Sequence, residues 1–295
     1  MKNYRILIIG ASGLVGSNCL KYLRDQEEFE VEGTYFSFQL EGLHFFDTLN
    51  LDAADNFDIE SFKPTHILHA GALTHVDYCE SHEEESYLKT VQSTKNILQL
   101  AEKYASSVIY ISTDYVFDGL AGPYDEEAKV NPLSVYAKHK LEAERLVRNQ
   151  SSQNLILRVT NVYGDEARNK NFVARLLEMG MNKEGAILNL PVDQYATPVN
   201  AFDVAKVLYL LISDFKSGIY NIASTDYLNR VQLAQKVMIH FLGNHVSIIA
   251  KLTSELNQAA LRPLHGGLKS AKFLSEYPHF YFTSVDEYLY SKIAR

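Results

Sequence analysis

The sequence predicts an α/β protein with a Rossmann-type, doubly wound parallel sheet and a smaller C-terminal α/β lobe. Short apolar runs alternate with amphipathic helical segments over residues 1–165, which is typical of repeated strand–helix units. A glycine-rich turn joins the first apolar run to the first helical segment. Beyond residue 165 the alternation becomes irregular. We therefore expect one domain over residues 1–165 and a second lobe over residues 166–295, with chain segments interleaving between them.

The composition indicates a large folded protein and excludes several classes of partner. A chain of 295 residues with 46% hydrophobic content is long enough to bury a core of domain size. The formal charge of −8 argues against a nucleic-acid partner, because neutralising phosphates requires an excess of Lys and Arg. No apolar run approaches the roughly 20 residues that cross a bilayer. No signal-peptide pattern precedes the first strand. We expect no membrane partner and a cytoplasmic location.

The cysteines and histidines show no metal-ligand pattern. Cys19 and Cys79 form neither a disulfide framework nor a metal-ligand spacing, so buried thiols are expected. His66, His69 and His75 fall in one strand and the loop after it, without the spacing of a zinc site. We expect no metal site.

The first strand–helix unit carries a dinucleotide-binding pattern. The run Arg5–Ile9 is continuously apolar after its first residue, as expected for a central parallel strand that is covered on both faces. The turn Gly10–Gly16 follows at once and leads into a helical pattern. Glycines in such a turn let the backbone approach a pyrophosphate at the helix amino end. The cofactor-binding residues expected here are Gly10, Ser12, Gly13, Leu14 and Gly16.

The second strand, Glu30–Tyr35, bears on the choice of nicotinamide cofactor. NAD-selective proteins usually place an acidic residue after this strand, hydrogen-bonded to the ribose 2′-hydroxyl. Here Tyr35 and Ser37 occupy this region, and neither a carboxylate nor a nearby Arg follows. We expect NADP(H) to be favoured, with NAD(H) remaining open. A third strand is expected at Leu43–Phe46, after which Asp52 either reaches the adenine edge or serves as a loop or helix-capping residue.

The fourth strand starts at His66 and ends in small residues. Its last positions are Ala70, Gly71 and Ala72, where a backbone passes close to a cofactor. A helix with an apolar face over residues 87–104 follows.

The fifth strand and the next helix supply candidate catalytic residues. The apolar run from Ile109 stops at Thr113, and Tyr136 and Lys140 follow four residues apart, on one helical face. A free phenol titrates near ~10, so a nearby cation favours proton transfer at neutral pH. Because the carboxyl ends of parallel strands share one sheet edge, these residues are expected to meet the glycine turn in one crevice.

The remainder of the chain predicts a sixth strand and a second, less regular lobe. Asn154–Val159 is the sixth strand, and further strands are expected at Ala186–Leu190 and Gly218–Ile222. An amphipathic helix is expected over Asn229–Leu242, with a stop at Gly243.

Together these motifs resemble the extended short-chain dehydrogenase/reductases, and within them the dTDP-4-dehydrorhamnose reductase family. The general features are the three glycines of the first turn and the Tyr136/Lys140 pair. More specific are the stretches at residues 69–77, 112–119, 158–164, 193–198 and 262–263. The resemblance extends over nearly the whole chain, and it makes the first domain a dinucleotide-binding domain and the second lobe a substrate-binding lobe.

The resemblance implies specific roles for the site residues. Tyr136 would protonate the oxygen of a sugar 4-keto group while the nicotinamide delivers hydride to its carbon. Lys140 would hold the nicotinamide ribose and lower the pKa of Tyr136, and Thr113 would bind the same oxygen. The residues implied to contact the nucleotide-sugar substrate are Val76, Thr113, Asp114, Tyr115, Tyr136, Asn161 and Arg262. A homodimer is one candidate assembly.

Several departures from the family pattern leave the nucleotide and the sugar open. Ala137 and His139 stand where the family often has Gly and a small polar residue, and the segment after Arg262-Pro263 differs. Two alternative functions remain: a nucleotide-sugar epimerase or dehydratase, and a non-catalytic NADP-binding protein like the regulatory subunit of methionine adenosyltransferase. An epimerase usually has the acidic ribose contact that is missing here, and a dehydratase would need a carboxylate pair where only Asp114 is present.

Overall fold

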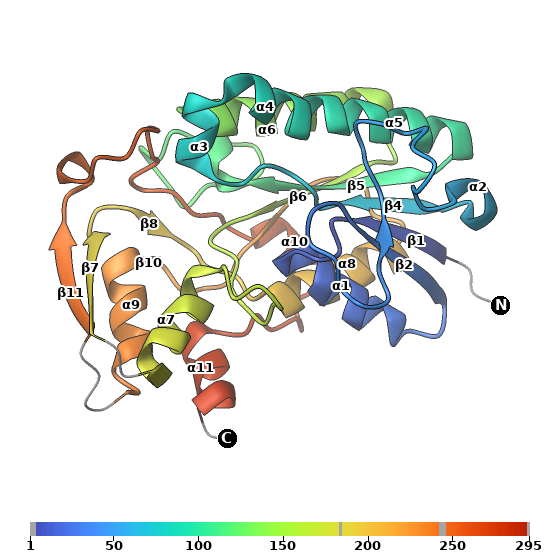
Figure 1. Ribbon diagram of the computed structural model, residues 1–295. Helices are drawn as coiled ribbons and strands as arrows, with labels where there is room; N and C mark the ends of the chain where they lie inside the picture. Colours follow the sequence, from blue (N-terminus) through green and yellow to red (C-terminus); the bar gives the residue numbers. More distant parts are fainter. Residues whose placement is uncertain (1–3, 183–184, 242–245, 294–295) are drawn as a thin grey trace.

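The centre of the molecule is a seven-stranded sheet in which every pair of neighbouring strands is parallel (Figure 1). The computed structural model describes residues 4–182, 185–241 and 246–293. The strand order is β3-β2-β1-β4-β5-β6-β9, so the chain reverses direction across the sheet between β1 and β4. The strands are β1 Tyr4–Ile9, β2 Phe29–Tyr35, β3 His44–Phe45, β4 His66–His69, β5 Ser107–Thr113, β6 Leu155–Val159 and β9 Gly218–Ile222.

The apolar runs form central strands because both faces of the sheet are covered by helices. In β1, Ile6 and Ile8 face one apolar core, while Leu7 and Ile9 face another. The first core lies under α1 and α8, and the second lies under α5 and α6 (Figure 1). The helices of the two layers are α1 Leu14–Arg24, α8 Ala201–Ser213, α5 Ser93–Tyr104 and α6 Val135–Gln150.

Short helical elements complete the sheet domain. One predicted helix over residues 87–104 is divided in the structure, because a π-helical turn at Leu88–Gln92 precedes α5. The remaining short elements are α2 Ile59–Phe62, α3 Val76–Ser81, α4 Glu83–Tyr87, α10 Ala271–Glu276 and a 3₁₀ turn at Asp114–Val116.

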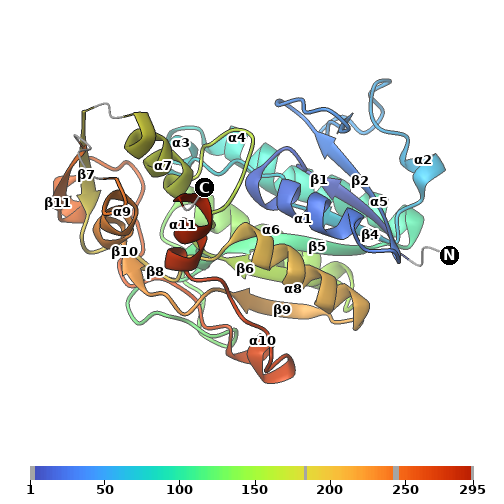
Figure 2. The same cartoon turned by 90° about the horizontal axis from the view of Figure 1, so that it is seen from below.

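A second lobe lies beyond the carboxyl edge of the sheet, at the left of Figures 1 and 2. It has its own apolar core, built around Val173, Leu176, Leu233, Val237 and Leu289. Its two small sheets pair β7 with β11 in parallel and β8 with β10 in antiparallel orientation. Its elements are α7 Phe172–Asn182, β7 Ala186–Pro191, β8 Tyr195–Ala196, β10 Leu228–Asn229, α9 Arg230–Met238, β11 Val246–Lys251, a 3₁₀ turn at Thr253–Glu255 and α11 Val285–Ile293.

The predicted fold class is confirmed. The strand Gly218–Ile222, which follows residue 165, pairs with β6 and extends the main sheet, so the chain does interleave between sheet and lobe. The division near residue 165 stays a prediction. The helix that begins near residue 230 ends at Met238, earlier than predicted, and the expected end at Leu242 and stop at Gly243 lie outside the described residues. The strand Val246–Lys251 was not predicted, although its apolar run could have indicated it.

Among the helices of the described residues, none combines the length and the apolar character needed to cross a membrane.

Candidate active site

The glycine turn lies where the sheet changes direction and leaves the amino end of α1 open. Gly10 has φ +84°, and a Cβ there would come within 2.9 Å of the backbone nitrogen of Gly71. A Cβ on Gly16 would lie 2.3 Å from the carbonyl oxygen of Gly10, so the fold itself requires these two glycines. Gly13 is different, because a Cβ there would meet nothing closer than 3.4 Å.

The open position at Gly13 fits a dinucleotide. Gly13 is the N-cap of α1 and no side chain caps this end. The first N–H groups of a helix have no partner within the helix, and with the helix dipole they attract a phosphate. Ser12 and Leu14 flank Gly13 in the same turn. The residues present therefore fit the pyrophosphate of a nicotinamide cofactor.

The ends of β2 and β4 lie beside this turn. The Ala11 N–H donates to the Thr34 carbonyl oxygen at 2.7 Å, and the Ala70 N–H donates to the Ile9 carbonyl oxygen at 3.0 Å. The predicted cofactor residues Ala70, Gly71 and Ala72 thus follow β4 directly at the glycine turn, all partly buried.

The residues predicted for the adenosine end follow β2 and β3. The partly buried ring of Tyr35 meets Phe45 edge-on, with ring centroids 5.9 Å apart. Ser37 is exposed in the loop after β2, and Asp52 is exposed in a turn beyond β3.

Thr113, Tyr136 and Lys140 come from β5 and from the first turns of α6, and all three are buried. Ser134 caps α6 by accepting the Ala137 N–H at 3.3 Å, which fixes where Tyr136 emerges. The Thr113 hydroxyl lies beside the Tyr136 phenol and donates to the Asp114 Oδ1 at 3.4 Å. The Lys140 Nζ donates to the Ile111 carbonyl oxygen at 2.6 Å and lies 4.1 Å from the centroid of the Tyr110 ring.

Burial has the largest effect on the pKa values of the Tyr136 phenol and the Lys140 ammonium. It raises the pKa of the Tyr136 phenol well above its usual value, while the neighbouring Thr113 hydroxyl acts in the opposite direction. Burial also lowers the pKa of Lys140 to about 7, against the attraction of the Glu144 carboxylate one helical turn away. Tyr136 is therefore held as the neutral phenol, which is the form that donates a proton. The predicted effect of Lys140 on the Tyr136 phenol stays a prediction.

Apolar and aromatic side chains pack beside Tyr136. The Tyr115 and Tyr136 rings meet edge-on with centroids 5.9 Å apart. Val76, the first residue of α3, packs in the same cluster with Cys79 and Val135. The predicted sugar contacts Val76 and Tyr115 are thus brought together with Tyr136, although they come from three different segments.

The Asp114 carboxylate connects segments of the site that are far apart in the sequence. Its Oδ2 accepts from the Thr160 hydroxyl at 2.7 Å and from the Gly267 N–H at 3.1 Å, and the side chain is buried. Burial raises the pKa of this carboxyl, and the bonds from Thr160, Gly267 and Thr113 oppose that shift. Asp114 therefore ties the ends of β5 and β6 to the C-terminal segment.

The segment that departs from the family pattern packs by its backbone. Gly267 has φ +88°, and its N–H makes the bond to Asp114. On the facing loop, a Cβ on Gly122 would lie 2.3 Å from the His265 carbonyl oxygen. Close backbone approach thus holds residues 263–268 against the loop after β5.

Two pairs of polar side chains, Arg262 with Asp77 and Arg230 with Asn161, lie near Tyr115. Burial raises the pKa of the Tyr115 phenol, and the nearby Arg262 guanidinium acts to lower it; the Arg262 Nη2 lies 2.7 Å from the Asp77 carboxylate. Asn161 follows β6 with φ +40°, and its Oδ1 accepts from the Arg230 Nη2 at 2.7 Å.

The sequence interpretation missed Arg230, the first residue of α9. Burial lowers its pKa, the Tyr115 phenol and the Asp114 carboxylate act against this, and the guanidinium of Arg262 adds to it. Within the described ranges no carboxylate forms an ion pair with Arg230, so its charge is open to an anionic ligand. No local motif could have indicated this residue, because a single Arg at a helix start is usually a solvated charge.

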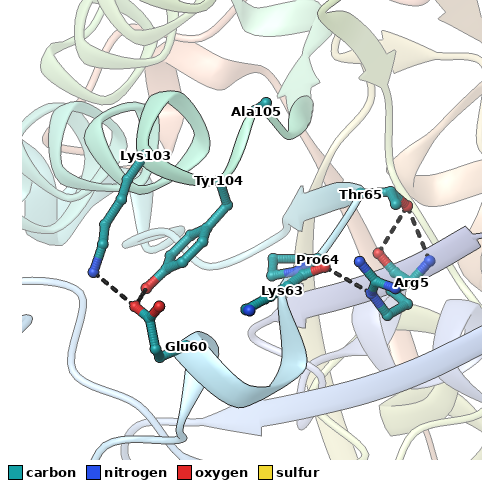
Figure 3. Close-up of a pocket in the computed structure, with 8 residues that line it drawn as sticks. All are labelled: Arg5, Glu60, Lys63, Pro64, Thr65, Lys103, Tyr104 and Ala105. Atoms are coloured by element: carbon teal, nitrogen blue, oxygen red, sulfur yellow. Dashed lines mark hydrogen bonds and ion pairs between the residues drawn. The ribbon is translucent and has the colours of Figure 1, made fainter.

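A surface cavity of about 470 Å³ lies elsewhere, at the amino ends of β1 and β4 (Figure 3). Lys103 Nζ and the Tyr104 hydroxyl both donate to the Glu60 carboxylate, at 3.0 and 2.9 Å. Arg5 Nε donates to the Lys63 carbonyl oxygen at 2.7 Å. Since ligands of doubly wound sheets bind at the carboxyl edge, this cavity is separate from the candidate active site.

Comparison with known proteins agrees with this geometry. Residues 4–287 match the family model described as the RmlD substrate binding domain. The dTDP-4-dehydrorhamnose reductase of Aggregatibacter actinomycetemcomitans is 32% identical over 280 residues, which are 91% of this chain and 91% of that protein. The dTDP-4-dehydrorhamnose reductase of Bacillus anthracis, solved in complex with NADP, superposes with a TM-score of 0.84 at 25% identity, covering 99% of this chain and 98% of that one.

The regulatory alternative also has a relative. Methionine adenosyltransferase 2 subunit beta of Xenopus laevis is 32% identical over 237 residues, which are 78% of this chain and 70% of that protein. The family match and the full-length reductase relatives confirm the resemblance that the motifs indicated. The regulatory interpretation has less support.

Proposed function

The chain belongs to the RmlD substrate-binding-domain family, and from this premise we propose that it reduces the 4-keto group of a nucleotide-linked deoxy sugar. NADPH is the favoured hydride donor and NADH the alternative. The observation that supports this proposal is that Thr113, Tyr136 and Lys140 are buried at the carboxyl end of β5, while the open glycine turn follows β1 in the same parallel sheet.

The cofactor would be held by the amino end of α1 at Gly13 and by the small residues after β4, with Tyr35 and Ser37 toward the adenosine. When bound, the nicotinamide supplies a hydride to the carbonyl carbon. Lys140 is the residue we assign to its ribose. A protonated Lys140 would also stabilise the phenolate that remains after proton donation.

Tyr136 completes the reduction by donating its phenolic proton to the carbonyl oxygen, so that the C=O group becomes a secondary alcohol. Thr113, whose hydroxyl lies beside that phenol, would donate a hydrogen bond to the same carbonyl oxygen. Burial keeps Tyr136 in its protonated form in the free protein. The closed environment of both side chains strengthens these interactions by excluding water.

We assign Arg230 and Arg262 to the diphosphate of the nucleotide-sugar. Arg230 carries a positive charge, and its hydrogen-bond acceptor among the described residues is the neutral amide oxygen of Asn161. A planar guanidinium matches two phosphate oxygens at once. Both arginines lie beside Tyr115, whose ring contacts Tyr136, so a diphosphate there would place the sugar near the phenol.

Replacing Arg230 by Gln tests this assignment. We expect the Kd for dTDP, measured by calorimetry, to rise at least about tenfold, the scale of a lost charge-assisted hydrogen bond. NADPH affinity should stay unchanged. Arg145→Gln, a change at an exposed position on α6, is the matched control and should alter neither value. Unchanged dTDP binding in Arg230→Gln would remove Arg230 from the substrate site.

The test of the function is an assay of NADPH oxidation by the purified protein. We expect oxidation when dTDP-4-dehydro-L-rhamnose is added and none without it. No turnover with any of several nucleotide 4-keto sugars, together with retained NADPH binding, would contradict the enzyme proposal and favour the regulatory one. An epimerase would instead convert the sugar without net NADPH oxidation.

The expected setting of this activity is the cytoplasm, without a nucleic-acid partner, as the net charge of −8 favours. A homodimer is the candidate assembly, and light scattering of the purified protein tests it.

A further inference from the structure

The loop after β2, where the adenosine end of the cofactor is expected, contacts a positively charged residue that the sequence around β2 does not reveal. Neither an acidic residue nor an Arg follows Tyr35, so the local sequence offers no charged group to a ribose 2′-phosphate. In the structure, a residue far along the chain reaches this region. The guanidinium carbon of Arg168 lies 5.2 Å from the centroid of the Phe38 ring, in the loop after β2.

Arg168 belongs to the loop between β6 and α7, which passes beside the amino end of α1 (Figures 1 and 2). The Asn18 amide donates to the Asp165 carbonyl oxygen at 2.8 Å and so ties this loop to α1. Inside the loop, the Asn171 amide donates to the Gly164 carbonyl oxygen and to the Glu166 carboxylate, both at 2.9 Å. These bonds anchor the loop that contains Arg168 to α1, the helix whose amino end is open to the pyrophosphate.

The charge of Arg168 is not neutralised by its own loop. Asp165 accepts from the Tyr288 hydroxyl at 2.9 Å and pairs with Lys292. Glu166 is bound by the Asn171 backbone N–H at 2.6 Å as well as by its amide. In the parts of the chain that the structure describes, no carboxylate forms an ion pair with Arg168, and its buried Nε has no hydrogen-bond partner.

The contact with the Phe38 ring uses none of the N–H groups of Arg168 as hydrogen-bond donors to another side chain. A guanidinium that lies over a ring uses its face, while its N–H groups remain at the edge of the plane. Those N–H groups are suited to bidentate hydrogen bonds with phosphate oxygens. Ser37, the neighbour of Phe38 in the sequence, is exposed in the same loop and carries a hydroxyl.

We propose that Arg168 binds the 2′-phosphate of the NADPH adenosine and thereby sets the preference for NADPH over NADH. This inference rests on the proposed nicotinamide-dependent function and names the residue that selects the cofactor. The selecting charge comes from the loop after β6 and not from the loop after β2. A ribose that lacks the 2′-phosphate gains nothing from Arg168, which makes the discrimination specific.

The experiment is a calorimetric titration of the full-length protein with NADPH and, separately, with NADH. For Arg168→Ala we expect the Kd for NADPH to rise at least about tenfold, since a charge-assisted phosphate contact is lost. The Kd for NADH should change less than about twofold, which also shows that the variant is folded. Lys170→Ala, which removes an exposed charge from the same loop, is the matched control and should leave both values unchanged.

Two kinds of result would overturn the inference. Equal weakening of NADPH and NADH would show that Arg168 acts by packing alone, and an unchanged Kd for NADPH would remove it from the site. If Lys170→Ala weakened NADPH binding as much as Arg168→Ala, the effect would come from the net charge of the loop and not from Arg168 itself. Turnover is not part of this measurement, so a protein that binds NADPH through Arg168 but reduces no nucleotide-sugar would contradict the proposed reaction alone.

Discussion

Tyr136→Phe is expected to lower kcat for nucleotide-sugar reduction at least ~100-fold, the usual scale for losing a general acid. Phenylalanine keeps the ring and its packing against Tyr115 and Val76. It removes only the hydroxyl that lies beside Thr113 and that we assign to proton donation. The loss should therefore appear in kcat, whereas the Kd for NADPH should change little.

The measurement is steady-state kinetics together with a calorimetric titration of NADPH. Tyr290→Phe removes a hydroxyl from a ring that is 63% exposed on α11, and it should behave as the unchanged protein. Wild-type turnover in Tyr136→Phe would show that another group supplies the proton.

Lys140→Met is expected to abolish most of the activity and at the same time to stabilise the cofactor-free protein. Burial lowers the pKa of Lys140 to about 7, whereas an unfolded lysine titrates near ~10.4. Between these values the unfolded chain binds a proton that the native chain does not. The free energy of unfolding of the wild-type protein therefore increases as pH rises from about 7 to ~10.4. Below about pH 7 Lys140 is a buried ammonium in the native protein, and the full desolvation penalty of this charge lowers the free energy of unfolding.

Methionine matches the length of the lysine stem without the charge. We therefore expect the free energy of unfolding to rise by about 1–4 kcal/mol at pH 6, the range seen when buried charges are replaced by apolar groups. The advantage should shrink as pH approaches ~10. Urea unfolding at pH 6 and pH 9 measures this difference. A variant that is less stable than wild type at pH 6 would contradict the assignment of a strained, buried ammonium.

The sequence predicts well the features that depend on residues close together in the chain. The apolar run of β1, the glycines after it and the helical spacing of α1 lie within one short segment. The pair Tyr136 and Lys140 occupies one helical face, and the rule for parallel sheets places Thr113 at the same edge. The family and the fold that follow from these motifs are confirmed.

The features that the sequence hides depend on contacts between distant segments. Asn161 meets Arg230 across 69 residues, and Arg168 meets Phe38 from the other half of the chain. Neither arginine stands in a local motif, so periodicity and spacing carry no signal for them. Asp114 shows the same effect, because its partners Thr160 and Gly267 were not predictable from the loop that contains it.

The central claim is that this site reduces a sugar carbonyl by adding hydride to carbon and a proton to oxygen. The most direct test supplies the purified protein with NADPH that carries deuterium at the transferred position and with dTDP-4-dehydro-L-rhamnose. Mass spectrometry and NMR of the product should find deuterium bonded to C4 of a newly formed secondary alcohol, at a yield matched to the NADPH consumed. A converted sugar without deuterium at C4, or no conversion while NADPH stays bound, would contradict the claim.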